Sequence, residues 1–213
     1  VKLNAEPCGN VVINVVSGDT GEATVSAASL TFTTSNWATD QTITVTGVDD
    51  SLDDGNITAN TVLSINQGST VAEYDGVGSQ NVAVTTVDND AVGFTVTLTG
   101  GSTSVTEVSG DAEDTFLVKL NAEPSGNVVI NVVSGDTGEA TVSAASLTFT
   151  TVNWDTPQTI TVTGVNDFLD DGDITANTAL SINTGSTSDE YDGVGSQNVA
   201  VTTVDNDTAG FTV

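Results

Sequence analysis

A direct repeat of 117 residues constrains the fold more than any other feature of this sequence. The heptapeptide VKLNAEP begins at Val1 and again at Val118, and an ungapped alignment of 1–96 with 118–213 leaves 13 mismatches in 96 positions. Only 97–117 has no counterpart, so a complete unit runs from about Ala91 to Asp207. We therefore expect a piece of a longer tandem array: a first domain at 1–90, a second at 91–207, and the start of another repeat at 208–213.

Within each unit the hydrophobic residues alternate with a period of two. Val128, Ile130 and Val132 share one face, and Ile160 and Val162 alternate with threonines. Short Val/Thr-rich strands separated by Gly, Asn and Asp turns are typical of an all-β sandwich or barrel. We expect about seven strands in the complete unit, at 94–107, 115–121, 127–133, 139–149, 157–164, 176–182 and 197–204.

The charge balance excludes several functions. The chain has 29 acidic residues, two lysines and no histidine, for a formal charge of −27. Nucleic-acid binding needs a basic surface, and so does attachment to anionic lipid. No apolar run reaches the length of a membrane span, so we expect no membrane insertion. Without histidine, and with carboxylate pairs confined to turns, we expect no enzyme. The single Cys8 aligns with Ser125 and is interpreted as an incidental surface thiol.

Alternating strand direction collects the acidic segments at one end of the unit. If successive strands are antiparallel, the segments 108–114, 134–139, 166–173 and 205–207 meet there. Two carboxylates 4 Å apart repel by about 4 kcal/mol at an effective dielectric constant of 20. A cage of carboxylate and carbonyl oxygens suits Ca²⁺ better than Mg²⁺, which keeps its waters. Solvated turns are the alternative for any single loop. For four converging loops we expect calcium, and Asp136 of 134–139 is included among the candidate ligands.

The run ASLTFTTVNWDTPQTITVTGVNDFLDDGD (145–173), followed by VAVTTVDND (199–207), resembles the Calx-β type of repeat found in tandem in large bacterial surface and adhesin-like proteins. The most specific pieces are GVNDFLDDGD (164–173) and the terminal TVDND. The resemblance implies immunoglobulin-like antiparallel β-sandwiches that bind calcium at the loops near the domain junction. Carried over by position, it implies these ligands: Glu107, Asp167, Asp170, Asp171, Asp205 and Asp207 in the second copy, and Asp50, Asp53, Asp54, Asp88 and Asp90 in the first.

The expected function is structural. We interpret the chain as a calcium-stiffened repeat of an extracellular or cell-surface fibre, stalk or adhesin; the alternative is an adhesion module that binds a glycan or protein. The expected partners are neighbouring repeats of the same or an identical chain. Because the first unit lacks its opening strand, its exposed edge invites strand complementation, for example by Gly210–Val213.

Overall fold

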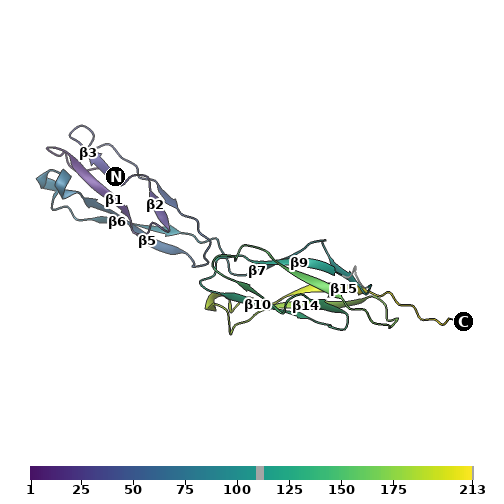
Figure 1. Cartoon of the computed structure of the whole chain (residues 1–213). Helices are drawn as coiled ribbons and strands as arrows, with labels where there is room; N and C mark the ends of the chain where they lie inside the picture. Colours follow the sequence, from purple (N-terminus) through teal and green to yellow (C-terminus); the bar gives the residue numbers. More distant parts are fainter. Residues whose placement is uncertain (109–112, 213) are drawn as a thin grey trace. The chain divides into compact units, whose positions relative to one another are not determined.

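The computed structural model describes residues 1–108 and 113–212 and is all-β apart from three single-turn 3-10 helices. The chain divides into two compact units. The first comprises Val1–Asp50 and Asp54–Asn89, and the second comprises Ser51–Asp53 and the chain from Asp90 onward. Each unit is a set of short, mostly antiparallel strands (Figure 1). Among the described residues, no helix has the length and hydropathy needed to cross a membrane.

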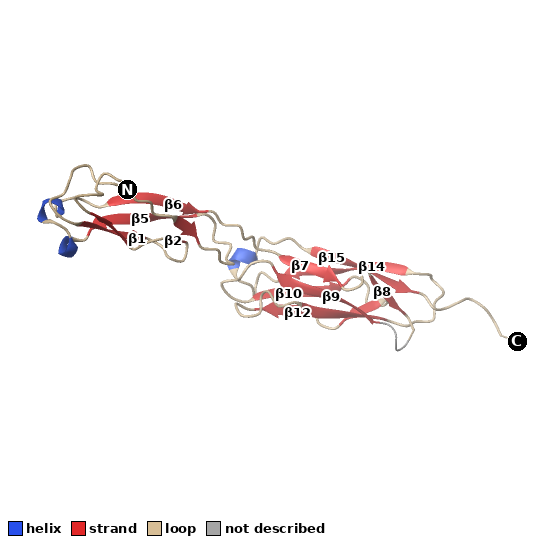
Figure 2. Ribbon diagram, turned by 90° about the horizontal axis from the view of Figure 1, so that it is seen from above, coloured by secondary structure: helices blue, strands red, loops and turns tan. Residues whose placement is uncertain are grey.

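The second unit is a complete immunoglobulin-like sandwich of two sheets. One sheet has the order β11-β13-β9-β7, and the other has the order β12-β10-β14-β15-β8 (Figure 2). Phe116, Ile130 and Leu180 are fully buried between the two sheets, which follows from their period-two spacing. The strands are β7 (Phe94–Leu98), β8 (Thr103–Thr106), β9 (Glu113–Leu120), β10 (Val128–Ser134), β11 (Ala140–Val142), β12 (Ser146–Phe149), β13 (Gln158–Gly164), β14 (Ile174–Ile182) and β15 (Gln197–Val204).

Two of the expected strands are each divided between the sheets, so their prediction as continuous strands was wrong. The 94–107 segment forms β7, which pairs with β9, and then β8, which pairs in parallel with β15. Gly101 adopts a φ of +80° between them, a conformation that favours glycine. The 139–149 segment likewise forms β11 on β13 and β12 on β10. Pairing with two different sheets requires a break in each segment.

The strand pairings confirm that successive strands alternate in direction. β10 runs antiparallel to β12 and β14, and β14 runs antiparallel to β15. The parallel β8–β15 pair agrees with this pattern, because the first and last of seven alternating strands point the same way. The described parts of the acidic segments therefore gather at one end of the unit, while 109–112 of the first segment lie outside the described residues.

The first unit is an incomplete version of the same sandwich. Its sheets have the orders β3-β1-β5-β6 and β2-β4. Its described residues contain no counterpart of β7 or β8, and Val1–Leu3 corresponds to the end of β9. The inner face is consequently open: Val82 is 53% exposed, whereas its counterpart Val199 is 3% exposed. The strands are β1 (Val11–Ser17), β2 (Ala23–Val25), β3 (Ser29–Phe32), β4 (Val45–Gly47), β5 (Ile57–Ile65) and β6 (Gln80–Thr86).

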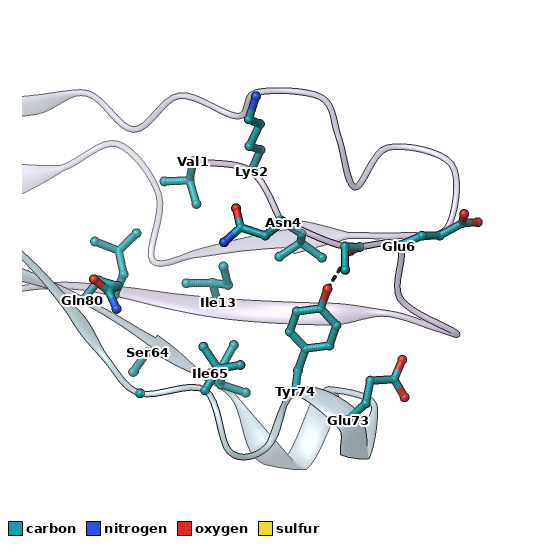
Figure 3. A pocket seen from close by; sticks show the side chains of 15 residues that line it. Val1, Lys2, Asn4, Glu6, Ile13, Ser64, Ile65, Glu73, Tyr74 and Gln80 are labelled. Carbon is teal, nitrogen blue, oxygen red and sulfur yellow. Dashed lines mark hydrogen bonds between the residues drawn. The ribbon is translucent and has the colours of Figure 1, made fainter.

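Tyrosines close the end of each unit that lies opposite the acidic segments. η3 (Asp189–Tyr191) buries Tyr191 completely, and its hydroxyl donates to the Ala122 carbonyl at 2.6 Å. In the first unit η2 (Ala72–Tyr74) places Tyr74 on the Ala5 carbonyl at the same distance, at an exposed site (Figure 3). η1 (Gln67–Ser69) precedes it. Both tyrosines therefore have a structural role at this end of the unit.

Cys8 occupies the place of Ser125 at this end. Its amide and thiol donate to Glu73 at 2.8 and 3.0 Å, and the amide and hydroxyl of Ser125 donate to Glu190 in the same way. The hydrogen bond to Glu73 is the main cause that raises the pKa of Cys8. The thiol thus replaces a hydroxyl in a local hydrogen-bond pattern at an exposed position.

We expect Tyr191→Phe to destabilise the second unit by about 1–3 kcal/mol, because the buried Ala122 carbonyl loses its donor where water does not replace it. The matched change Tyr74→Phe should cost less, since its carbonyl acceptor is exposed. Amide NMR spectra recorded in a urea series would resolve the two units. Equal losses in both would contradict this account.

Candidate metal centre

Among the described residues, carboxylates converge in three groups at the acidic ends of the units. In each group the oxygens lie within 4.8 Å of one another. The second unit holds two groups, Glu107–Asp167–Asp207 and Glu139–Asp167–Asp171, which share Asp167. The first unit holds Glu22–Asp50–Asp54, which is the Glu139–Asp167–Asp171 group displaced by the 117-residue repeat. We call these groups the Glu107 triad, the Glu139 triad and the Glu22 triad.

Strand ends place these side chains together. Glu107 follows β8, and Glu139 precedes β11. Asp167 and Asp171 lie in the β13–β14 loop, and Asp207 follows β15. Because the first unit has no described counterpart of β8, its described residues lack the strand that delivers Glu107, and only the Glu22 triad forms there.

Several carboxylate oxygens in the second unit are buried without a partner. Glu107 is 2% exposed and Glu139 is 9% exposed. Among the described residues, Oε2 of each glutamate and Oδ2 of Asp207 are buried and receive no hydrogen bond. Ionised oxygens withdrawn from water need a compensating charge or donor. Their position beside other carboxylates therefore fits a bound cation.

The pKa values of the triad glutamates also fit a bound cation. Burial is the main cause that raises the pKa of Glu107, and Asp167, Asp205 and Asp171 raise it further, against an opposing hydrogen bond from the Asn206 amide. Burial, and then the charges of Asp171 and other neighbours, also raise the pKa of Glu139.

The same causes act in the first unit. Burial and then Asp54 and Asp50 raise the pKa of Glu22. All three glutamates are therefore held more readily in the protonated form unless a cation compensates the charge.

Other predicted ligands bind backbone amides instead. Asp205 accepts from Gly172 at 2.8 Å and from Asp207 at 2.7 Å, and these bonds lower its pKa. Asp170 accepts from the Ala209 amide at 2.7 Å.

The first copy repeats this pattern. Asp53 accepts from the Val92 amide and Asp88 from Gly55, both at 2.8 Å. In the second copy, Asp136 accepts a hydrogen bond from the backbone amide of Gly138 at 2.9 Å, within its own turn. These five carboxylates orient the loops and the chain that leaves each copy.

The predicted residues thus divide into two classes. The triads contain Glu107, Asp167, Asp171, Asp207, Asp50 and Asp54. The residues outside the triads are Asp53, Asp88, Asp90, Asp136, Asp170 and Asp205. Sequence reasoning missed Glu22 and Glu139, although the acidic segment 134–139 ends on Glu139. The sequence signal for Glu139 was its position directly before the strand that starts at Ala140, at the end of the unit where the acidic segments meet.

Together, the fold and the triads define the chain as an all-β protein of immunoglobulin-like sandwiches with acidic groups suited to a cation. No protein-family model matches it, and no curated protein matches it. Similar solved structures include domains 4 and 5 of the S-layer protein SbsC, with 17% identity, coverage of 90% of this chain and 70% of that chain, and a TM-score of 0.42.

Two further structures show similar levels of similarity. The calcium binding domain CBD12 of CALX1.1 shows 12% identity, coverage of 84% and 70%, and a TM-score of 0.38. The D00-D0 domain of intimin shows 14% identity, coverage of 96% of each chain, and a TM-score of 0.37.

In chelator at neutral pH, Glu107→Gln should raise the melting temperature of the second unit, because it removes a buried charge. The raised pKa means that the folded state binds the proton more tightly than the unfolded state. The contribution of Glu107 to stability therefore grows as the pH falls from neutral towards its unfolded pKa of about 4.3. The gain from Glu107→Gln should shrink over that range. Calorimetry at several pH values checks this, with the exposed Glu113→Gln as the control.

Proposed function

We propose that this protein is a calcium-binding structural repeat of an extracellular fibre, stalk or adhesin, without catalytic activity. The observation that supports it best is the pair of triads that share Asp167 and contain buried carboxylate oxygens with no hydrogen-bond partner among the described residues. A calcium ion in each triad satisfies those oxygens. The second unit then takes two ions and the first unit takes one.

The donor set favours calcium over other metals. Every triad ligand is a carboxylate, the chain has no histidine, and Cys8 lies at the opposite end of its unit beside Glu73. Soft and borderline metals prefer sulfur and nitrogen ligands. Calcium accepts six to eight oxygens, so carbonyls and waters complete the shell around three carboxylates, whereas magnesium is usually held by one or two.

Calcium would order the acidic end of each unit by connecting segments that are far apart in sequence. In the second unit the triads connect the ends of β8 and β15 with the β13–β14 loop. That loop also holds the departing chain, through the Asp170–Ala209 hydrogen bond. Fixing the loop therefore stiffens the segment that leads out of the unit.

Because calcium binding would stabilise the folded state, the proposed site suits an extracellular setting. An ion that binds only the folded state stabilises it by RT ln(1 + [Ca²⁺]/Kd), about 1.4 kcal/mol per site at a tenfold excess over Kd. Extracellular modules commonly bind calcium with Kd of roughly 10⁻⁴–10⁻³ M. Such sites fill outside cells and stay empty at cytosolic calcium concentrations.

Isothermal titration should detect calcium binding, and chelation should lower the melting temperature by about 4 °C for each 1 kcal/mol lost. Asp167→Asn should remove both sites of the second unit, since both triads use this side chain. Asp50→Asn should remove the single site of the first unit. Asp155→Asn, an exposed carboxylate of the opposite end, is the control and should leave the number of sites unchanged. Unaltered binding in Asp167→Asn would falsify the metal assignment.

Stiffening has its own readout. Addition of calcium should slow hydrogen exchange at three amides: those of Gly172 and Asp207, which donate to Asp205, and that of Ala209, which donates to Asp170. NMR exchange rates with calcium and with chelator measure this effect. Exchange that is equally fast in both conditions, despite bound calcium, would show that the ion stabilises the unit without ordering its exit.

A further inference from the structure

Tension along the chain would reach the second unit through its first and last strands. The chain enters through β7 and β8 and leaves after β15, and β8 and β15 are parallel neighbours. Their ladder begins at Thr103, opposite Val201, and ends at Thr106, opposite Val204. Tension would therefore pull the two strands in opposite directions along one ladder. The hydrogen bonds of such a pair carry the load together, whereas strands opened from one end lose their bonds one at a time.

β8 is a short strand held by a small set of contacts. It extends over four residues, of which Val105 is buried in the core. The Ser104 amide donates to Asp114 at 2.9 Å. Among the described residues, the hydroxyls of Thr103 and Thr106 are buried and have no hydrogen-bond partner, so neither strengthens the ladder. A further link at the end of β8 would therefore add substantially to its resistance.

The Glu107 triad lies at the end of this pair of strands. Glu107 directly follows β8, and its amide continues the ladder by donating to the Val204 carbonyl at 3.3 Å. Asp207 lies shortly beyond the end of β15. Sliding of β8 against β15 under tension would separate Glu107 from Asp207. An ion held by both carboxylates would oppose that movement.

The Glu139 triad lies outside this path. Glu139 precedes β11, and Asp167 and Asp171 belong to the β13–β14 loop. β11 pairs with β13, and β13 pairs with β9, so neither strand belongs to the β8–β15 ladder. An ion in this triad would stabilise the folded unit without joining the two strands that tension pulls apart.

We propose that β8 and β15 are the load-bearing pair of the second unit and that calcium in the Glu107 triad locks them together. This inference rests on the proposed function, because it requires calcium in the triads. The two ions then have different roles. The ion at Glu107 sets the resistance to tension, and the ion at Glu139 contributes to stability alone. A fibre of such units carries its load where calcium is abundant and yields when calcium is withdrawn.

Constant-force unfolding of the full chain tests this proposal. The handles are attached through Ala91→Cys and Thr208→Cys, at two exposed positions on either side of the second unit. Cys8→Ser removes the native thiol and introduces the residue that the second copy has at Ser125. Force then acts across the second unit alone, and the measured quantity is its unfolding rate.

Calcium at tenfold excess over its Kd should slow unfolding of this parent protein about tenfold, because the lock breaks before the transition state is reached. Glu107→Gln should lose the effect and unfold equally fast in calcium and in chelator. Glu139→Gln is the matched control, since it makes the same change in the other triad. It should keep the tenfold effect.

Isothermal titration separates this inference from the proposed function. Each of the two glutamine variants should bind one calcium ion fewer than the parent. If the parent binds calcium but unfolds at the same rate in calcium and in chelator, the lock does not exist, although the calcium sites stand. The same conclusion follows if Glu107→Gln keeps the tenfold effect or Glu139→Gln loses it. A parent that binds no calcium would overturn the proposed function together with the lock.

Discussion

Repulsion between like charges at one end of each sandwich is the constraint on which the site depends. The alternating strands deliver glutamates and aspartates from separate segments to the same place, in a chain that has only two lysines to offset them. Backbone amides stabilise some of these carboxylates by donating hydrogen bonds to them, as at Asp205 and Asp170. Among the described residues, Oε2 of Glu107 and Oε2 of Glu139 are buried and receive no hydrogen bond. Protonation or a bound cation would compensate these oxygens, so the proposed calcium binding is coupled to the fold.

One segment links the core to the acidic end. The 94–107 segment crosses from one sheet to the other. It buries Phe94 at one end of the sandwich and places Glu107 at the opposite, acidic end. The described residues of the first unit include no counterpart of this segment, and only the Glu22 triad forms among them. Closure of the core and completion of the second triad therefore depend on the same stretch of chain.

The repeat, the alternation and the turn residues predicted an all-β sandwich or barrel and the convergence of the acidic loops, and the Calx-β resemblance favoured the immunoglobulin-like sandwich. They were insufficient where a residue's role depends on its partner across the fold. The breaks in 94–107 and 139–149 arise from pairing with two sheets, which period-two spacing does not encode. Asp170 and Glu139 both lie in the acidic segments. Asp170 accepts a hydrogen bond from a backbone amide, whereas Glu139 lies buried in a triad. The direction of each side chain, and not its type, separates these roles.

Sharing of Asp167 also determines how much charge the ions would remove. Two calcium ions would bring four positive charges to the five carboxylates of the two triads in the second unit, and one ion would bring two to the three carboxylates of the Glu22 triad. The triad carboxylates of each unit would then keep one negative charge in total, beside the charges of the acidic residues outside the triads. With all three ions bound, the formal charge would change from −27 by +6, to −21. Neutralisation is thus confined to the strand ends, and the remaining surface charge favours colloidal stability between copies in solution.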